Sequence, residues 1–373
     1  MKIFLIAGEA SGDRLGAALM AGLRSLVPGV EFAGVGGALM TEQGMHSLFA
    51  MEELSVMGLA EVVPKYLHLK RRIAECAAAV LAARPDGLIT IDSPDFCLRV
   101  ARLVKAARPD QRTMHYVAPS VWAWRPGRAV KMAQVIDHVL ALLPFEPPLM
   151  RAAGMSCDFV GHPVVAEPLA SADERAHWAG PGPLILTLPG SRRGEVARLA
   201  PVIGQVLARI RSVYPDARVA LPTVRGVADL VRDLSRDWPI QPQIITDAAL
   251  KRGAFAAADV AIAASGTVSL ELAAHRVPMV IAYDMHPVTL WLMRRAALID
   301  TVTLVNIVSD SRVVPEFLGK DCRADRIAPV VLGLLADGAG AQRAAMDLTM
   351  QRLGQGDEPP GLRAARSVLA HLP

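Results

Sequence analysis

The stretch Leu184-Ile-Leu-Thr-Leu-Pro-Gly-Ser-Arg-Arg-Gly-Glu-Val196 decides the fold, because within it a strand pattern changes into a helical one. The apolar run ends at a Pro-Gly pair, and the helical pattern begins near Glu195. A tight glycine turn that leads into a helix presents free backbone N–H groups and a positive dipole end, which favour phosphate. Ser191 adds a hydroxyl donor, and Arg192 adds a guanidinium that can grip two phosphate oxygens. The stretch therefore predicts a phosphate site in the middle of the chain.

Short β-rich runs alternate with helical patterns along the whole chain, which is typical of a parallel α/β architecture. In the first half we expect strands at residues 2–7, 31–35, 87–91, 113–117, 138–142 and 157–160. In the second half we expect them at residues 184–188, 217–221, 243–246, 260–263 and 279–282. The phosphate turn thus follows the first strand of a second α/β half, and open α/β sheets bind ligands at the carboxyl ends of their strands.

A chain of 373 residues is too long for one ordinary core, so we expect two domains. The segment 164–183 is rich in Ala, Pro, Gly and charge and has no clear periodicity, which indicates the boundary. We expect a first domain at residues 1–163 and a second at 164–350. We expect the helical tail at 351–373 to pack back onto the first domain.

The composition narrows the class of protein. Hydrophobic residues make up 52% of the chain and the mean hydropathy is +0.33, yet no run of about 18 uninterrupted apolar residues predicts a membrane-spanning helix. The net charge is +4, and aromatic residues make up 5%, which argues against a nucleic-acid surface. Anionic substrates or an anionic membrane surface fit better. The four cysteines lack metal-site or disulfide spacing, so we expect them to be reduced, cytosolic and structural.

The segment Gly8–Asp13 follows the first strand and opens the first helix, with Ser11 as a candidate helix N-cap. It lacks the spacing of the dinucleotide fingerprint, and Glu9 and Asp13 would oppose a pyrophosphate. We therefore expect a contact with a sugar or acceptor here. The alternative is a purely structural turn.

Two carboxylates follow the strand that ends at Ile91, at the cleft end of the predicted sheet. Asp92 there could act as a general base that deprotonates a sugar hydroxyl. The alternative is that Ser93 or Asp95 caps a helix that begins at Pro94. Capping explains Asp95 but leaves Asp92 unexplained, so we favour a function for Asp92.

Two further loops could line the same cleft. Residues 115–125 contain two of the five tryptophans, including Trp122, and the alternative is that both are packing anchors. Ser120 and Arg125 beside them give a mixed apolar and cationic lining that suits a phosphorylated lipid. His162 lies near the expected hinge, where it could take part in cleft closure, although a lone histidine is more often a satisfied loop residue.

The segment 264–271, Ala-Ser-Gly-Thr-Val-Ser-Leu-Glu, again follows a strand and opens a helix. Ser265 and Thr267 can donate hydrogen bonds to phosphate, and Glu271 can accept them from the two ribose hydroxyls of a nucleotide. The alternative is a capping box of Ser265 or Thr267 with a first-turn acid. Two phosphate-type turns in one half favour a nucleotide.

Two apolar stretches with a basic fringe are candidates for contact with an anionic membrane. The first precedes Lys70, Arg71 and Arg72, and the second precedes Arg294 and Arg295. The apolar residues that we expect in this patch are Val56, Met57, Val62, Val63, Tyr66, Leu69 and Trp291. Buried core helices give similar patterns, so both interpretations stay open.

Taken together, these motifs resemble the lipid-A-disaccharide synthase family of bacterial glycosyltransferases. The matching segments are GEASGD (8–13), GVGG (34–37), VMGLAEV (56–62), IDSPDF (91–96), YVAPSVWAWR (116–125), LPFE (143–146), FVGHP (159–163), LPGSRRGEV (188–196), ASGTVSLE (264–271) and Asn306. They run in order across nearly the whole chain, and YVAPSVWAW together with LPGSR is highly specific.

The resemblance implies a GT-B fold, in which two doubly wound Rossmann-like domains face each other across a cleft. It implies inverting transfer of 2,3-diacylglucosamine from UDP to 2,3-diacylglucosamine 1-phosphate, with a β(1→6) link and release of UDP. It implies no required metal or cofactor and no nucleic acid. It also implies a cytoplasmic enzyme at the anionic surface of the inner membrane, and it leaves a homodimer open.

The resemblance also assigns roles to residues. The UDP diphosphate would be held by Gly190, Ser191 and Arg192, and the nucleotide site would be completed by Ser265, Gly266, Thr267 and Glu271. Arg192 would offset the charge of the leaving group without a metal. Asp92 matches the family's essential aspartate, and Asn306 matches an asparagine that is important for activity. Arg125 or Arg295 could meet the acceptor phosphate.

Two other classes of function stay open. One is a different UDP-sugar transferase or a UDP-sugar epimerase, against which YVAPSVWAW argues. The other is a non-catalytic protein that binds nucleotides or docks on membranes. The pairing of Asp92 with Arg192 argues against it, because a binding protein needs no base opposite a leaving group.

Overall fold

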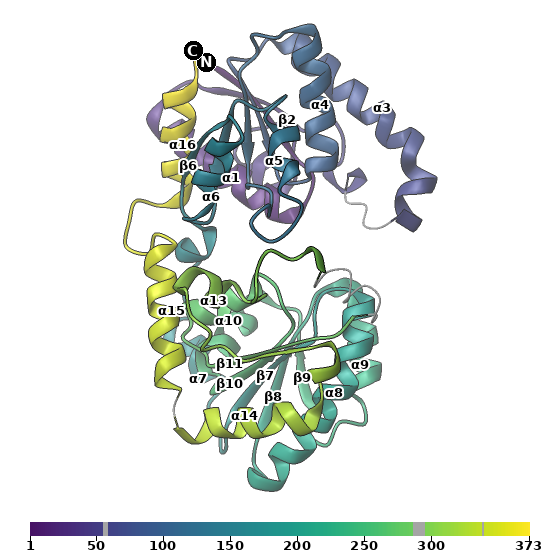
Figure 1. The fold of residues 1–373 in the computed structure, drawn as a ribbon, viewed down its shortest axis with the longest axis vertical. Helices are drawn as coiled ribbons and strands as arrows, with labels where there is room; N and C mark the ends of the chain where they lie inside the picture. The colour runs from purple at the N-terminus through teal and green to yellow at the C-terminus, as the bar shows by residue number, and fades with distance from the viewer. Residues whose placement is uncertain (55–58, 286–294, 338) are drawn as a thin grey trace. The chain divides into compact units, whose positions relative to one another are not determined.

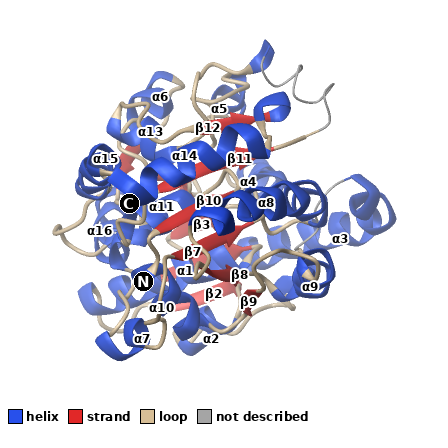
Figure 2. Ribbon diagram, turned by 90° about the horizontal axis from the view of Figure 1, so that it is seen from below, coloured by secondary structure: helices blue, strands red, loops and turns tan. Residues whose placement is uncertain are grey.

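The computed structural model describes residues 1–54, 59–285, 295–337 and 339–373, and this description leaves out the side chains of residues 59–66 and 337. The chain forms two compact units (Figure 1). Unit 1 contains residues 1–166 and 356–373, and unit 2 contains residues 167–355. In both units helices surround the strands of a parallel sheet (Figure 2).

Unit 1 is built on a six-stranded parallel sheet in the order β2-β1-β3-β4-β5-β6. Its strands are β1 (Lys2–Ala7), β2 (Glu31–Val35), β3 (Gly87–Ile91), β4 (Thr113–Tyr116), β5 (His138–Ala141) and β6 (Ser156–Phe159). The chain runs from β1 to β2 on one side and then returns past β1 to β3. The strand order therefore reverses between β1 and β3, where open α/β sheets place their ligands.

Side-chain alternation along β1 shows how this sheet is covered on both faces. Leu5 points into a core shared with α1 (Ala10–Leu26) and α16 (Pro360–His371). Phe4 and Ile6 point into a core shared with α3 (Leu59–Ala83) and α4 (Pro94–Ala107). Since residues alternate between faces, a strand buried on both sides is a continuous apolar run, as β1 is. The shorter helices of this unit are α2 (Ala38–Glu42), α5 (Gly127–Met132) and α6 (Glu146–Ala152).

The C-terminal helix α16 belongs to unit 1, although the chain reaches it from unit 2. It packs along α1 (Figure 1), and its Ser367 hydroxyl lies 2.9 Å from Nε2 of His138 on β5. The same hydroxyl donates to Asp158 on β6 at 2.7 Å. The last residues of the chain therefore complete the core of the unit that the first residues begin.

Unit 2 has a second six-stranded parallel sheet in the order β12-β11-β10-β7-β8-β9, so its strand order reverses between β7 and β10. Its strands are β7 (Leu184–Leu188), β8 (Arg218–Pro222), β9 (Pro242–Ile245), β10 (Val260–Ala263), β11 (Met279–Tyr283) and β12 (Glu316–Leu318). The eleven strands expected from the sequence all exist, with ends that differ by at most one residue. The short edge strand β12 was not expected.

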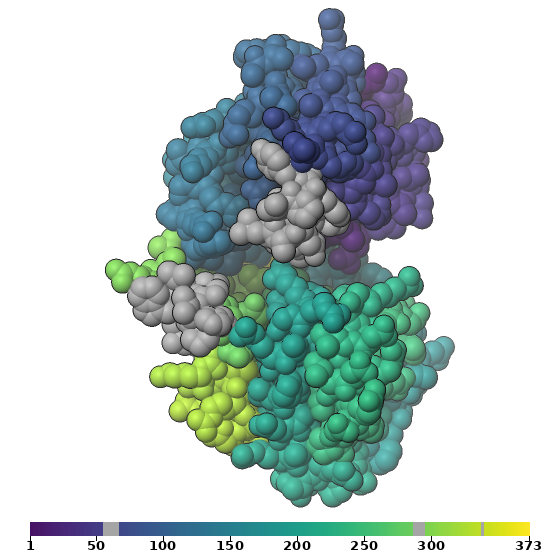
Figure 3. Space-filling model, turned by 90° about the vertical axis from the view of Figure 1, so that its right-hand side faces the viewer, coloured from purple at the N-terminus to yellow at the C-terminus, as the bar shows by residue number. Residues whose placement is uncertain are grey.

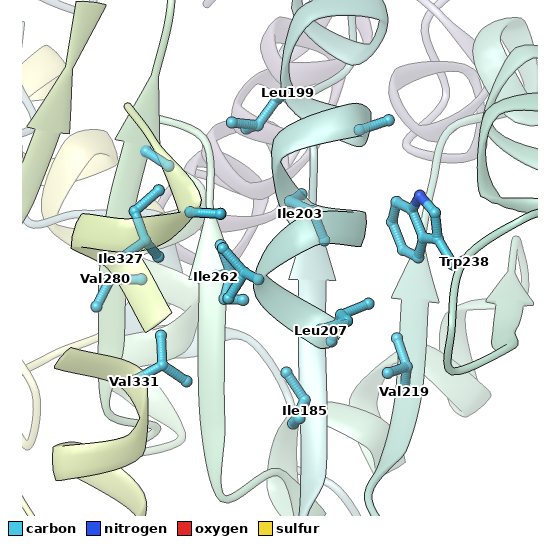
Figure 4. Close-up of a cluster of buried hydrophobic side chains, with 14 of the residues drawn as sticks. Ile185, Leu199, Ile203, Leu207, Val219, Trp238, Ile262, Val280, Ile327 and Val331 are labelled. Carbon is cyan, nitrogen blue, oxygen red and sulfur yellow. The ribbon is translucent and has the colours of Figure 1, made fainter. Parts of the chain in front are cut away.

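Helices α8 (Arg193–Val213), α9 (Ala228–Ser235) and α14 (Ala324–Asp337) cover one face of this sheet. Figure 4 shows Ile203 and Leu207 of α8 and Ile327 of α14 directed at strand side chains such as Ile262. The remaining helices of this unit are α7 (Ala172–Ala176), α10 (Ala248–Ala257), α11 (Val268–Ala274), α13 (Leu304–Ser309) and α15 (Gly340–Arg352).

The expected boundary segment 164–183 is only partly a connection. The two units divide between residues 166 and 167, and most of the segment belongs to unit 2. It contains α7, which begins with a capping box in which Ser171 and Glu174 bond each other's backbone N–H groups. Glu174 also forms an ion pair with Arg252, which fixes α7 against α10.

Candidate active site

A pocket of about 460 Å³ lies at the carboxyl edge of the unit 2 sheet, where the strand order reverses. Loops that follow β7, β8 and β10 form its walls. The lining residues are Leu188, Gly190, Ser191, Arg192, Glu195, Pro222, Thr223, Val224, Lys251, Ala264, Ser265, Gly266, Thr267, Val268 and Glu271. The structure thus brings together all seven residues that the sequence assigned to a nucleotide site, and the roles of these residues stay predictions.

The turn after β7 has the geometry that a phosphate cradle needs. Gly190 has a φ of +109°, and a Cβ there would lie 2.6 Å from a carboxylate oxygen of Glu195, so the turn requires glycine. Glu195 accepts hydrogen bonds from the backbone N–H of Arg192 at 3.4 Å and from its guanidinium at 3.3 Å. The Arg192 side chain is 64% exposed, and helix α8 begins at the next residue.

The loop after β10 does not form the capping box that was the alternative interpretation. Thr267 is the N-cap of α11 but makes no side-chain capping bond. The Ser265 hydroxyl donates instead to the carbonyl oxygen of Val302, at 3.2 Å. Gly266 and Thr267 are exposed at the pocket wall.

Glu271 meets a partner that the sequence did not suggest. Its carboxylate forms a hydrogen-bonded ion pair with the ammonium of Lys251 on α10. Lys251 also lies 5.2 Å from the ring centre of Phe255. A single lysine on a helix has no motif around it, so only the three-dimensional fold reveals that it lines the pocket.

Asn306 lies on α13 and is 1% exposed. Its side-chain amide donates to the carbonyl oxygen of Val314 at 2.9 Å, and its oxygen accepts from the N–H of Val314 at 3.0 Å. The amide also lies 3.4 Å from Glu316, whose carboxylate accepts from the N–H groups of Val302 and Thr303. Asn306 therefore holds the loop whose Val302 carbonyl binds Ser265.

At the carboxyl edge of the unit 1 sheet, Asp92 occupies a strained turn directly after β3. Asp92 and Ser93 both have positive φ angles, +53° and +43°. One oxygen of Asp92 accepts from the N–H of Ser93 at 2.9 Å. A Cβ on Gly8 would lie 2.5 Å from the Ser93 hydroxyl oxygen, so the turns after β1 and β3 are in contact. Left-handed conformations at non-glycine residues are costly and concentrate at functional sites.

The turn after β1 differs from the sequence expectation in two respects. Helix α1 begins at Ala10 with Glu9 as its N-cap, so Ser11 lies within the first turn and does not cap it. Asp13 is 5% exposed and accepts hydrogen bonds from three N–H groups at the start of α2, at 2.8 to 3.0 Å. Because this buried carboxylate satisfies N–H groups at a helix start, we favour a structural role for Asp13.

In the loop after β4, Trp122 contacts two residues at the start of α6. Its indole N–H donates to Glu146 at 3.2 Å, and its ring meets Phe145 edge-on at 5.3 Å. Burial raises the pKa of Glu146 to about 7. Ser120 and Arg125 in the same loop are exposed.

His162 is a buried loop histidine whose Nδ1 accepts from the N–H of Val164 at 3.2 Å. Burial lowers its pKa to about 4, so the imidazole is neutral at physiological pH.

Comparison with known proteins agrees with this geometry. Residues 3–360 match the family model described as lipid-A-disaccharide synthetase. The lipid-A-disaccharide synthase of Ruegeria pomeroyi is 61% identical, with 100% of this chain and 96% of that protein covered. The enzyme of Rhodospirillum centenum is 50% identical, with 99% and 94% covered. The chain belongs to the lipid-A-disaccharide synthase family.

Solved structures show the GT-B fold for this family member. A putative UDP-N-acetylglucosamine 2-epimerase from Listeria monocytogenes matches with a TM-score of 0.66 at 14% identity, covering 99% of this chain and 95% of that one. The glycotransferase of kitacinnamycin matches with a TM-score of 0.63 at 16% identity, covering 100% and 99%. The fold is therefore shared by epimerases and transferases, and the family membership rests on the sequence matches.

Most of the membrane patch expected for this family member cannot be placed. Val56, Met57, Val62, Val63, Tyr66 and Trp291 lie outside the described residues or have side chains that are not described. Leu69 is partly buried against the core under α3, and Arg72 of the basic fringe bonds Glu53 and Glu75. Within the described ranges, no helix is long and apolar enough to cross a membrane.

The described residues contain one group whose atoms are close enough to share a metal ion, formed by His138, Asp158 and His371. The two imidazoles stack with ring centres 3.7 Å apart and planes at 17°, so their nitrogen lone pairs run nearly parallel. A single ion would lie off the plane of at least one ring, and the Ser367 hydroxyl already bonds both His138 and Asp158. These residues fit an anchor for α16 better than a metal centre.

Proposed function

We propose that this chain transfers a 2,3-diacylglucosamine unit from UDP to the 6-hydroxyl of 2,3-diacylglucosamine 1-phosphate. The product is the β(1→6) tetraacyl disaccharide 1-phosphate, and UDP leaves. The observation that carries the proposal is the pocket of about 460 Å³ at the β7–β10 switch point, with two phosphate-type turns on its wall. Its volume lies in the usual range for small-ligand sites.

The donor nucleotide fits this pocket in one orientation. The diphosphate lies at the start of α8, where the backbone N–H groups around Ser191 and the positive dipole end favour an anion. Glu271 accepts hydrogen bonds from the ribose hydroxyls, while its ion pair with Lys251 orients its carboxylate. Pro222 and Val224 offer an apolar wall to the base.

Arg192 stabilises the departing UDP. In the described state its guanidinium bonds Glu195, but an ion pair this exposed is weak and exchanges readily for a phosphate. A guanidinium can bind two phosphate oxygens at once. Charge that develops on the leaving diphosphate is thereby neutralised by a residue of the chain.

Asp92 acts as the general base. The 6-hydroxyl oxygen of the acceptor attacks C1 of the donor sugar, the bond from C1 to the UDP oxygen breaks, and Asp92 takes the hydroxyl proton. The hydrogen bond from the N–H of Ser93 orients one carboxylate oxygen, and the strained turn holds the side chain at the end of β3. Direct displacement at C1 inverts the anomeric centre.

The acyl chains of both substrates place the reaction at a membrane surface, so we also propose peripheral association with an anionic leaflet. Helix α3 lies at the right-hand side of unit 1 in Figure 1 and faces the viewer in Figure 3. Its Leu67 is 77% exposed, and Lys70 is exposed one turn later. An exposed apolar residue beside cations suits the boundary between headgroups and acyl chains.

The decisive experiment incubates the purified protein with UDP-2,3-diacylglucosamine and 2,3-diacylglucosamine 1-phosphate and detects the disaccharide by mass spectrometry. Asp92→Asn should lower kcat by about 10²- to 10⁴-fold, because a general base contributes that much, while UDP binding stays unchanged. Asp110→Asn is the matched control, since Asp110 is exposed and lies after α4. Absence of the disaccharide with the wild-type protein would reject the function, and near-normal turnover by Asp92→Asn would reject the base.

A further inference from the structure

A second pocket, of about 630 Å³, lies on unit 1 and has a cationic lining. It is lined by Asp95, Trp124, Arg125, Gly127, Arg128 and Lys131. We propose that Arg125, Arg128 and Lys131 of this pocket bind the phosphomonoester group of the acceptor sugar. The inference rests on the function proposed above and names the part of the site that recognises the acceptor.

The three cations point to an anion because the lining sets three positive charges against the one carboxylate of Asp95. Within the described part of the chain, no carboxylate lies within 4.0 Å of the charged atoms of Arg125, Arg128 or Lys131. Some other cations of unit 1 are paired, as Lys105 is with Asp137 at 2.9 Å. Three like charges around one hollow repel each other, and a dianionic phosphate relieves that repulsion while it accepts several charge-assisted hydrogen bonds.

The spacing of these residues explains why they gather. They follow one another at intervals of three along the turn and the short helix α5 (Gly127–Met132), and residues three apart lie on the same helix face. Arg125 has a positive φ of +50°, and its carbonyl accepts from the N–H of Arg128 at 3.1 Å. A non-glycine residue in this conformation carries strain, which is typical of side chains held for a function.

Trp124 leaves the donors of Arg125 available. The guanidinium carbon lies over the indole ring, 4.2 Å from its centre, which is a cation–π contact. Such a contact requires no N–H hydrogen bond, and guanidinium N–H groups can bind phosphate oxygens. Trp124 is also 38% exposed, so the pocket offers an apolar surface next to the cations.

The location of the pocket favours the acceptor over a membrane headgroup. Asp95 of the lining lies in the first turn of α4, three residues after the proposed base Asp92. The remaining lining follows β4, the neighbour of β3 in the sheet. A phosphate bound here would place the attached sugar at the carboxyl edge where Asp92 must reach its hydroxyl group. The donor diphosphate has its own cradle on unit 2.

The proposal is tested with the double variant Arg128→Gln/Lys131→Gln. Its kinetic constants are measured in detergent micelles with acceptors that carry or lack the 1-phosphate. The variant should raise KM for the phosphorylated acceptor by about 10- to 100-fold, as expected for the loss of two charge-assisted bonds, and leave kcat and the donor KM within twofold. With the phosphate-free acceptor, variant and wild type should have equal KM. Arg99→Gln/Arg102→Gln on the exposed side of α4 removes the same charge outside the lining and should leave every constant unchanged.

Two further measurements distinguish binding of the acceptor phosphate from binding of a lipid headgroup. Calorimetric titration with glucosamine 1-phosphate should show binding that the double variant loses, and this readout stands even if the wild type forms no disaccharide. Co-sedimentation with vesicles that contain phosphatidylglycerol tests the membrane instead. An unchanged acceptor KM overturns the proposal, and if vesicle binding falls at the same time, the patch serves a lipid headgroup.

Discussion

At the scale of single residues, Asn306 and Glu316 connect a buried network to the nucleotide pocket. Asn306 bonds both backbone groups of Val314, and Glu316 receives the N–H groups of Val302 and Thr303. Ser265 at the pocket wall donates to the carbonyl of Val302. The side-chain amide of Asn306 is engaged inside the protein, so we infer that it is a positioning residue that fixes the loop opposite the β10 turn.

Asn306→Ala should therefore act through stability and donor binding together. The substitution leaves the buried N–H and carbonyl of Val314 without partners, which costs about 2–4 kcal/mol of unfolding free energy. The Val302 carbonyl then shifts, and the Kd for UDP should rise. Urea denaturation and calorimetric UDP titration measure the two effects. Ser311→Ala, on the same loop, is the milder control because its hydroxyl bonds the exchangeable hydroxyl of Ser309 and no backbone group among the described residues. A variant that lost turnover with unchanged stability and UDP affinity would show a direct catalytic role instead.

Residue-level chemistry was partly predictable from sequence. Motifs such as Pro-Gly-Ser-Arg carry their geometry locally, so Gly190 and Arg192 could be singled out from the sequence, and both line the pocket. The residues next to Lys251 and Glu316 in sequence do not indicate their roles, because their partners lie 20 and up to 15 residues away. The role of Asp13 has no signal in its neighbouring residues either, because it accepts from N–H groups at the start of α2, at least 24 residues away in sequence.

At the scale of elements, hydrophobic runs located the strands because a strand buried on both faces must be apolar throughout. β12 escaped prediction since Glu316–Leu318 is only three residues long and half-buried at the sheet edge. Helix α4 begins at Pro94, the position at which the capping interpretation predicts a helix start, because proline is favoured at a first helical position. Ser93 is its N-cap residue but makes no side-chain capping bond.

Helix α3 is the element with which the membrane proposal can be tested. Leu67→Glu places a charge at an apolar side chain that is 77% exposed, so folding should be little affected. If Leu67 enters the leaflet, losing its burial should lower the partition coefficient onto anionic vesicles by roughly tenfold. Co-sedimentation measures this coefficient. Leu169→Glu on unit 2, where the leucine is 62% exposed, is the control. Equal partitioning of both variants would remove α3 from the membrane contact.

At the scale of the whole molecule, each unit repeats one design, a six-stranded parallel sheet with a point at which its strand order reverses. Alternating strands and helices predict two such units. The division at residues 166 and 167 and the membership of α16 in unit 1 depend on contacts between distant segments. Ser367 reaching His138, 229 residues away, is such a contact, and periodicity cannot reveal it.

Unit 1 also concentrates buried ionisable groups, which makes its stability depend on pH. Burial lowers the pKa values of His115, His138 and His162 to about 3, 4 and 4. The unfolded chain protonates these histidines near pH 6.5 while the folded unit does not, so acid favours unfolding. Glu146 acts oppositely, since its pKa of about 7 keeps it protonated in the folded unit while the unfolded chain releases the proton above about pH 4.5.

The unfolded unit should thus bind a net two more protons than the folded one between about pH 4.5 and 6.5. The unfolding free energy should fall by about 2.7 kcal/mol for each pH unit of acidification in that window, as urea denaturation can measure. His162→Asn removes one of the three histidines, and its amide oxygen can still accept from the N–H of Val164, so the slope should drop to about 1.4 kcal/mol per unit. His46→Asn, at an exposed position, should leave the slope unchanged. If the unfolding free energy stayed constant from pH 6.5 to 4.5, the three histidines would have to be protonated in the folded unit as well. Burial of the histidines would then not explain how the stability of unit 1 depends on pH.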